Sequence, residues 1–279
     1  MELKTYFWNN LKVSRYEYLK KKILKPQKIV FKYGNSGDIF NIDLIKYLYK
    51  DIQVKNLRKQ ENRLMLVGST MSVLERGDIV NGIGWKGNDL SHIGDVIASA
   101  KIFGVRGPLT KSLFEKYGAD LSSLKFELDP GLLIKEVLGL STENNTNRNV
   151  IFIPHFNDIN AYKGIYPKDI KVVNIDTTPC RIAKEIQKAK VVYSSSLHGI
   201  IFSHALNKEC VFVKPQSEEP LFKYRDYYMS IGQEMPEPVK DIYSYNFKKD
   251  DGTILKEMIG IDDFFFPSID VLKQNKVIV

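Results

Sequence analysis

Residues 191–206, VVYSSSLHGIIFSHAL, join an apolar strand pattern to an apolar helix pattern through three serines and a histidine. On both sides of this segment, short β-branched or apolar runs alternate with helical patterns, which is typical of βαβ units around a parallel sheet. The chain has 279 residues, more than one hydrophobic core usually contains. We therefore predict an α/β fold with two Rossmann-like domains.

A polar run separates two series of strand patterns. Residues 141–149, STENNTNRN, lack apolar periodicity and predict an interdomain linker. We accordingly expect an N-terminal domain over residues 28–140 and a C-terminal domain over residues 150–279. The predicted strands are residues 28–33, 63–68, 78–82, 101–105 and 124–128 in the first domain, and the runs NVIFIPHF, KVVNID, KVVYS and CVFVKP in the second.

Two helices are marked by their terminal residues. In GPLTKSLFEKYG, Pro108 suits a first helical position and Gly118 a left-handed C-terminal stop. In TPCRIAKEIQKAK, Thr178 predicts the N-cap and Pro179 the first helical position.

Positive charge is concentrated at the N-terminus. Residues 1–32 contain nine lysines and arginines against two acidic residues, so they carry almost all of the net charge of +8. We interpret residues 1–27 as a basic arm, and we expect no nucleic-acid partner because the rest of the chain is nearly neutral. The arm also contains aromatic residues that suit a lipid headgroup boundary, which indicates an anionic membrane surface as a partner. A solvated, weakly ordered arm is the alternative.

Several classes of protein are excluded by simple patterns. No run approaches the ~18 consecutive apolar residues of a membrane span. The first residues also lack the apolar core of a secretory signal, so we expect a cytoplasmic protein. If the arm binds lipid, the protein is peripheral to the inner face of the plasma membrane. Cys180 and Cys210 have no zinc or redox spacing. His204 lies six residues after His198, about 240° around a helix, so the two do not form a metal pair. We expect no metal.

The loop after the first predicted strand has the composition of a ligand-binding turn. Gly34, Asn35, Ser36, Gly37 and Asp38 precede a helical pattern. Ligands of open parallel sheets bind beyond the carboxyl ends of the strands. Glycines there let the backbone approach a ligand, and the aspartate suits either a helix cap or a hydrogen bond to a hydroxyl. A plain turn with a capping aspartate remains the alternative.

Arg106 lies between a predicted strand and the helix that Pro108 opens. An arginine at that position suits a phosphate or a carboxylate, because the helix dipole adds favourable potential. A salt bridge to a neighbouring acid is the alternative.

The opening segment combines the features of an anion site with an acid–base group. Ser194, Ser195 and Ser196 offer donors at a helix N-terminus, Gly199 leaves room for a ligand, and His198 titrates near neutral pH. A histidine satisfied by backbone hydrogen bonds is the alternative. His155 ends a strand on the same expected edge of the second sheet.

The order of these motifs resembles the polysaccharide pyruvyl transferase family. The resemblance covers roughly residues 28–231 and is carried by GNSGD, GST at 68–70, NGIGW at 81–85, VRGPLT at 105–110, LDPGLL at 128–133, IPHFND at 153–158 and SSLHGIIFSHALN at 195–207.

The resemblance implies two Rossmann-like domains in a compact arrangement like that of GT-B glycosyltransferases, with the active site in the cleft between them. It implies an enzyme that moves pyruvate from phosphoenolpyruvate, as co-substrate and without a further cofactor, onto a sugar as a ketal. The implied acceptor belongs to a bacterial cell-surface polysaccharide or its lipid-linked precursor.

The resemblance also implies roles for single residues. Arg106 and Lys214 are the expected anion contacts, His198 the proton donor or phosphate partner, Asp38 the group that orients or deprotonates the acceptor, and Trp85 a stacking platform for the sugar. The further expected substrate-binding residues are Gly34, Asn35, Ser36, Gly37, His155, Ser195, Ser196, Leu197 and Gly199.

The chain departs from the family at one position. Many members carry an arginine immediately before the Leu-His pair, where this chain has Ser196. Two other readings therefore stay open: a GT-B-type nucleotide-sugar glycosyltransferase that uses the same cleft, and a non-catalytic binder of anionic glycans or lipids that relies on the arm.

Overall fold

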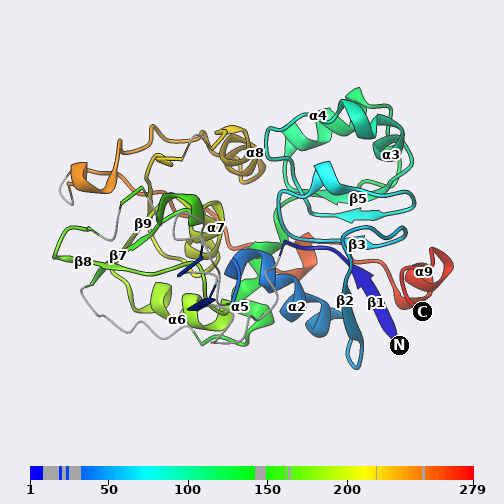
Figure 1. Cartoon of the computed structure of the whole chain (residues 1–279), viewed down its shortest axis with the longest axis horizontal. Helices are drawn as coiled ribbons and strands as arrows, with labels where there is room; N and C mark the ends of the chain where they lie inside the picture. Colours follow the sequence, from blue (N-terminus) through cyan, green and yellow to red (C-terminus); the bar gives the residue numbers. More distant parts are fainter. Residues whose placement is uncertain are drawn as a thin grey trace.

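The structure is a computed structural model that describes residues 1–8, 19–20, 23–24, 33–141, 149–159, 161–162, 165–217, 219–246 and 249–279. In these residues the elements form two parallel sheets with helices around them, which confirms the predicted α/β class. Figure 1 shows the four-stranded sheet on the left and the six-stranded sheet on the right, with α2 (Ser36–Leu48) and α5 (Ile134–Val137) between them. The GT-B-like arrangement stays a prediction.

The larger sheet has the strand order β2-β1-β3-β4-β5-β6, and its described pairings are parallel. Its strands are β1 (Glu2–Thr5), β2 (Gln53–Asn56), β3 (Leu64–Met65), β4 (Ile79–Asn81), β5 (Lys101–Val105) and β6 (Phe126–Glu127). The helical elements of this half are α4 (Pro108–Lys116), α3 (Gly94–Ala98), η1 (Met71–Val73), η2 (Ser91–Ile93) and η3 (Pro130–Leu133). Of the first predicted strand, residues 28–32 lie outside the described residues.

The position of β1 corrects the prediction of an N-terminal arm. Residues 2–5 alternate partly exposed and buried side chains, with Leu3 and Thr5 fully buried, and β1 pairs with β2 on one side and β3 on the other. The assignment of residues 1–27 to an arm is therefore wrong for this strand. Most of the predicted arm, residues 9–18, 21–22 and 25–27, lies outside the described residues.

The smaller sheet has the order β10-β9-β7-β8, again with parallel pairing. Its strands are β7 (Val150–Ile153), β8 (Ile170–Val172), β9 (Val191–Ser194) and β10 (Cys210–Phe212), and its helices are α6 (Pro179–Lys188), α7 (Leu197–Ala205) and η4 (Phe156–Ile159). The Thr178 side chain accepts a hydrogen bond from Arg181 N, so the predicted N-cap of α6 is confirmed.

One apolar core joins the two halves. It runs from Leu3 and Phe40 in the first half to Ile153 and Phe202 in the second. The rings of Phe40 on α2 and Phe202 on α7 meet edge to face at 5.8 Å. Burial of this shared core keeps the N-termini of α2 and α7 close together.

The C-terminal segment returns to the first half. α8 (Phe222–Ser230) contacts α4, and beyond it lie η5 (Ile242–Ser244), η6 (Ile261–Asp263) and α9 (Ile269–Gln274). Lys4 N donates to Val277 O at 3.0 Å and Val279 N to Glu2 O at 3.0 Å, and the two termini lie side by side in Figure 1. The final residues of the range 150–279 thus pack on the first sheet rather than on the second, because their apolar side chains are buried there.

Candidate active site

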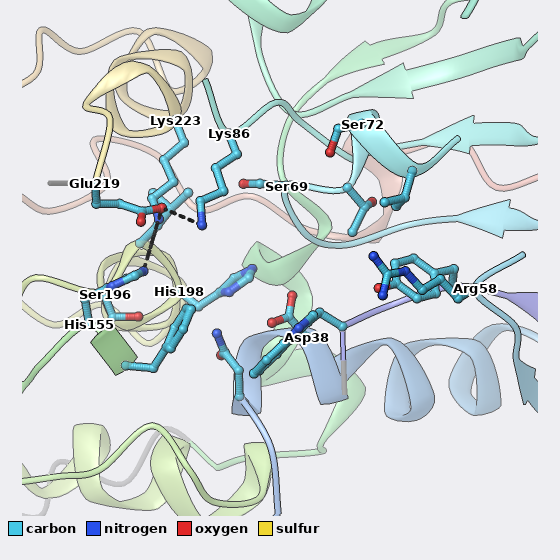
Figure 2. A pocket seen from close by; sticks show the side chains of 17 residues that line it. Asp38, Arg58, Ser69, Ser72, Lys86, His155, Ser196, His198, Glu219 and Lys223 are labelled. Atoms are coloured by element: carbon cyan, nitrogen blue, oxygen red, sulfur yellow. Dashed lines mark hydrogen bonds and ion pairs between the residues drawn. The ribbon is translucent and has the colours of Figure 1, made fainter. Parts of the chain in front are cut away.

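A pocket of about 240 Å³ opens where α2 and α7 begin. In Figure 2, Lys86, Lys223, Glu219 and His155 form one end and Arg58 the other. The lining residues are Tyr6, Trp8, Asn35, Asp38, Arg58, Ser69, Thr70, Ser72, Val73, Lys86, His155, Phe156, Ser196, Leu197, His198, Glu219 and Lys223.

Two motifs far apart in the sequence meet at the centre of this pocket. Asn35 caps α2, since its side chain accepts a hydrogen bond from Gly37 N at 3.0 Å. The imidazole of His198, in the first turn of α7, lies directly against Gly37: a Cβ at position 37 would be 1.9 Å from His198 Nδ1. Glycine at position 37 is therefore a condition for the close approach of the two helix N-termini.

Asp38 is a buried carboxyl group beside these termini. Only 8% of the residue is exposed, and burial raises its pKa to about 7, although Lys223 acts in the opposite direction. Desolvation disfavours the charged form of a carboxyl group. Asp38 therefore changes its protonation state near neutral pH, which suits a group that takes a proton from a hydroxyl.

His198 is neutral in the unliganded pocket. Burial lowers its pKa to about 3, and the positive charges of Lys223 and Arg106 act in the same direction. Its Nε2 is buried and has no hydrogen-bond partner among the described residues. An unpartnered buried nitrogen is costly, so this atom is available for a ligand.

The cationic end of the pocket is built around Glu219. Its Oε1 lies 2.7 Å from Lys223 Nζ, 3.4 Å from Lys86 Nζ and 3.9 Å from His155 Nε2. Burial lowers the pKa of Lys223 to about 8 and that of His155 to about 2. At neutral pH this end therefore holds two ammonium groups, one carboxylate and a neutral imidazole.

Arg106 lies behind the pocket and is fully buried. Its Nε donates to Asp226 Oδ2 at 3.1 Å, its Nη1 to Ser69 Oγ at 2.7 Å and its Nη2 to Trp85 O at 2.7 Å. Asp226 Oδ1 also accepts hydrogen bonds from the first backbone amides of α4, those of Leu109 and Thr110. The alternative of a salt bridge with an acid is thus confirmed, and the predicted anion position at α4 holds the carboxylate of Asp226.

Other predicted residues support the pocket without lining it. Ser195 Oγ donates to Asp158 Oδ2 at 2.7 Å, and Trp85 packs edge to face on Phe222 at 4.6 Å. Exposed Lys214 lies outside the pocket lining. The remaining predicted residues outside the lining are Gly34, Ser36, Gly37 and Gly199. The N–H of Gly34 donates to Asp176 and that of Ser36 to Ile175 O. Gly37 lies against the His198 ring, and Gly199 packs against Ser194 Oγ.

The far end of the pocket was not predicted. Tyr6 contributes to it because β1 belongs to the sheet. Trp8 also lines the pocket and stacks on Phe156, whose ring packs on His155. A buried ion pair behind it, Arg63 Nη2 to Asp78 Oδ2 at 2.6 Å, fixes the local backbone. Arg63 also donates to the carbonyl oxygens of Arg58 and Val73, two residues of the lining. No cluster of three or more metal-ligating side chains occurs in the part of the chain that the structure describes.

Over residues 2–217 the sequence matches the family described as polysaccharide pyruvyl transferase, more than half of the chain. The chain belongs to this family. The polysaccharide pyruvyl transferase match includes both motifs that meet at Gly37 and His198, and it ends before Glu219, Lys223 and Asp226.

Two individual proteins are also similar. An uncharacterized protein of Acanthamoeba polyphaga mimivirus is 30% identical over 176 residues, 60% of this chain and 58% of the viral protein, so the match spans little more than half of that relative. The crystal structure of a functionally uncharacterized protein from Klebsiella pneumoniae aligns over 81% of this chain and 98% of its own, with a TM-score of 0.47 and 14% identity. In the described residues, no helix is long and apolar enough to cross a membrane.

Proposed function

We propose that this protein transfers pyruvate from phosphoenolpyruvate to two hydroxyls of a sugar in a polysaccharide or its lipid-linked precursor, forming a ketal. One observation carries the proposal: in a chain of this family, the pocket brings the carboxyl of Asp38 together with the Nε2 of His198, which has no partner in the described part of the chain, beside the ammonium groups of Lys86 and Lys223. Cations suit the donor's phosphate and carboxylate, and a carboxyl group that titrates near pH 7 suits the acceptor hydroxyl.

The reaction balances without a redox partner. The methylene carbon of phosphoenolpyruvate takes up a proton and becomes the ketal methyl, which makes C2 the electrophile. Two acceptor oxygens bond to C2 as the C2–O bond to phosphate breaks. Of the two acceptor hydroxyl protons, one equivalent ends on the methyl carbon and the other on the released phosphate.

Each residue has a separate part in this proposal. Lys86, Lys223 and the N-terminus of α7 hold the anionic donor, since Ser196 caps that helix without a side-chain hydrogen bond and leaves its amides available. Asp38 takes the proton from the hydroxyl of the acceptor sugar. His198 forms a hydrogen bond to the donor through Nε2. The donor's negative charge raises the pKa of the imidazole, so that His198 becomes protonated in the complex. Arg106 positions Ser69 at the pocket wall.

The acceptor enters at the end of the pocket that Tyr6 and Arg58 line, and Trp8 of the same lining stacks on Phe156. Aromatic faces suit the apolar face of a sugar, and arginine suits an anionic group such as a phosphate on the acceptor. A lipid-linked acceptor at the cytoplasmic face of a membrane fits the cluster of lysines at residues 20–22.

Product analysis tests the proposed reaction. The protein is incubated with phosphoenolpyruvate and a panel of galactose-containing acceptors, and proton NMR of the acceptor is recorded with a phosphate assay. We expect a new methyl singlet and an equal amount of released phosphate, both lost in Asp38→Asn and kept in the exposed control Asp262→Asn. A parallel incubation replaces phosphoenolpyruvate with a nucleotide sugar. Transfer of its sugar to the acceptor would show that the protein is a glycosyltransferase and would overturn the proposal.

The membrane part of the proposal has its own test. Changing lysines 20–22 to glutamine leaves β1 intact, and it should reduce sedimentation with phosphatidylglycerol vesicles at low salt while turnover on a soluble acceptor persists. Equal sedimentation of the variant and the unchanged protein would remove the membrane from the proposal.

A further inference from the structure

Glu219 lies between two lysines at the cationic end of the pocket. Its side chain and that of Lys223 are 4% and 8% exposed, and the Lys86 side chain is 42% exposed. One carboxylate oxygen contacts both ammonium groups, at 2.7 Å and 3.4 Å. A single oxygen shared by two cations is also how a bound phosphate or carboxylate would be held there.

The three charged groups come from both halves of the molecule. Lys86 follows β4 in the first half, whereas Glu219 and Lys223 lie at the start of the α8 segment. The two segments are packed tightly, since Gly87 has φ +117° and a Cβ on it would be 2.7 Å from Pro220 Cβ. Figure 2 shows the Glu219 carboxylate and both ammonium groups facing the same space as His198.

The buried ammonium group of Lys223 needs a negative partner. Burial lowers its pKa to about 8, and Glu219 is the main group that opposes this effect. A charged lysine left alone in such a place is strongly unfavourable. An anionic ligand would supply the same compensation, and the unpartnered Nε2 of His198 in the same lining offers that ligand a hydrogen-bond partner.

We propose that Lys86 and Lys223 form the anion subsite of this pocket and that Glu219 occupies it as an internal competitor, which a ligand carboxylate or phosphate displaces. The idea rests on the proposed function for the identity of the ligand, phosphoenolpyruvate. Lys223 has an anionic partner both in the free pocket, where it is Glu219, and in the complex, where it is the ligand. The affinity for the donor therefore depends on how much more strongly the lysines bind the donor than Glu219.

Calorimetric titration of the full chain with phosphoenolpyruvate tests the competitor role. Glu219→Gln keeps the size of the side chain and removes its charge, so we expect the dissociation constant to fall about three- to tenfold. Lys223→Met should raise the dissociation constant tenfold or more. The exposed residues Glu115 and Lys116 on α4 give the matched controls Glu115→Gln and Lys116→Met, which should leave it unchanged. The titrations are run at pH 6.5, because loss of Glu219 lowers the pKa of Lys223 further and binding needs the ammonium form.

A double variant separates competition from positioning. If Glu219 competes for Lys223, Glu219→Gln should have little effect in a Lys223→Met background. Weaker or unchanged binding in Glu219→Gln alone would overturn the proposal and make Glu219 a residue that only orients Lys223. Glu219→Asp, whose shorter side chain cannot hold both lysines, should give an intermediate gain and serves if the glutamine variant does not fold.

Inorganic phosphate distinguishes a failure of this inference from a failure of the proposed function. If phosphate binds more tightly to Glu219→Gln but phosphoenolpyruvate binds to neither protein, the subsite stands and the donor is wrong. If phosphoenolpyruvate binds the unchanged protein and Glu219→Gln gains nothing with either anion, the donor stands and the competitor role is wrong.

Discussion

The imidazole of His198 lies against the backbone of Gly37, so close that a Cβ at position 37 would be 1.9 Å from Nδ1. This contact joins the N-termini of α2 and α7 and sets the distance between the Asp38 carboxyl and His198. Gly37→Ala should push the ring away, lower the rate at saturating donor by roughly a hundredfold and reduce stability slightly. Turnover with a melting scan checks this. Gly232→Ala is the control, because φ is +65° there and no atom lies within 4 Å of the added Cβ, so it strains the backbone without touching the site. Full activity in Gly37→Ala would show that the contact is not needed.

Asp38→Asn should stabilise the protein while abolishing turnover. The folded-state pKa of about 7 lies above the reference value of 3.8, so the folded state binds this proton more tightly than the unfolded state. The stability contributed by the protonated group is present below pH 4 and is lost as the pH rises to about 7. Urea unfolding should therefore show a gain of a few kcal/mol for the variant at pH 8 and little gain at pH 4. An equal effect at both values would show that Asp38 has an ordinary pKa.

The ratio kcat/KM for phosphoenolpyruvate should have a bell-shaped dependence on pH. It should rise through pH 7 as Asp38 loses its proton and fall above pH 8 as Lys223 becomes neutral. The charged groups that face Lys223 are Glu219, which raises its pKa, and Lys86 and Arg106, which lower it. In Glu219→Gln the descending limb should move to lower pH. If the descending limb stays at the same pH in this variant, the limb belongs to a group other than Lys223.

Much of the fold follows from local patterns. Strands β4, β5, β7 and β9 fall within predicted runs because short apolar stretches between helical patterns pair in parallel sheets. β1 was not predicted, because it has only four residues and one strongly apolar side chain. Next to a lysine-rich run, such a segment has the pattern of a basic arm. Its pairing partners, β2 and β3, lie more than 45 residues away in the sequence.

The centre of the site was predictable and its cationic end was not. Asp38 and His198 each come shortly after a predicted strand, and ligands of parallel sheets bind in the loops beyond the carboxyl ends of their strands. Lys223 and Glu219 are four residues apart, which in sequence is indistinguishable from a solvated pair on a helix surface. For Arg106 the sequence left ligand and salt bridge equally open, and only the position of Asp226 on α8, 120 residues away, decides between them.

Removal of Asp226 should destabilise the protein strongly. Asp226→Ala leaves the buried guanidinium of Arg106 without its carboxylate partner and the first amides of α4 without their acceptor. A loss of about 3–5 kcal/mol in the free energy of unfolding is expected. Asp262→Ala on the exposed surface should stay within about 0.5 kcal/mol. A loss below about 1 kcal/mol in Asp226→Ala would show that the buried pair does not hold α8 to the first half.

Binding of the donor is the sharpest test of pyruvyl transfer at this pocket, because it needs no knowledge of the acceptor. The unchanged protein and His198→Asn are titrated by calorimetry with phosphoenolpyruvate and, in parallel, with UDP-galactose. We expect saturable binding of phosphoenolpyruvate, weakened several-fold in His198→Asn, and no binding of the nucleotide sugar. Saturable binding of UDP-galactose without binding of phosphoenolpyruvate would contradict this expectation.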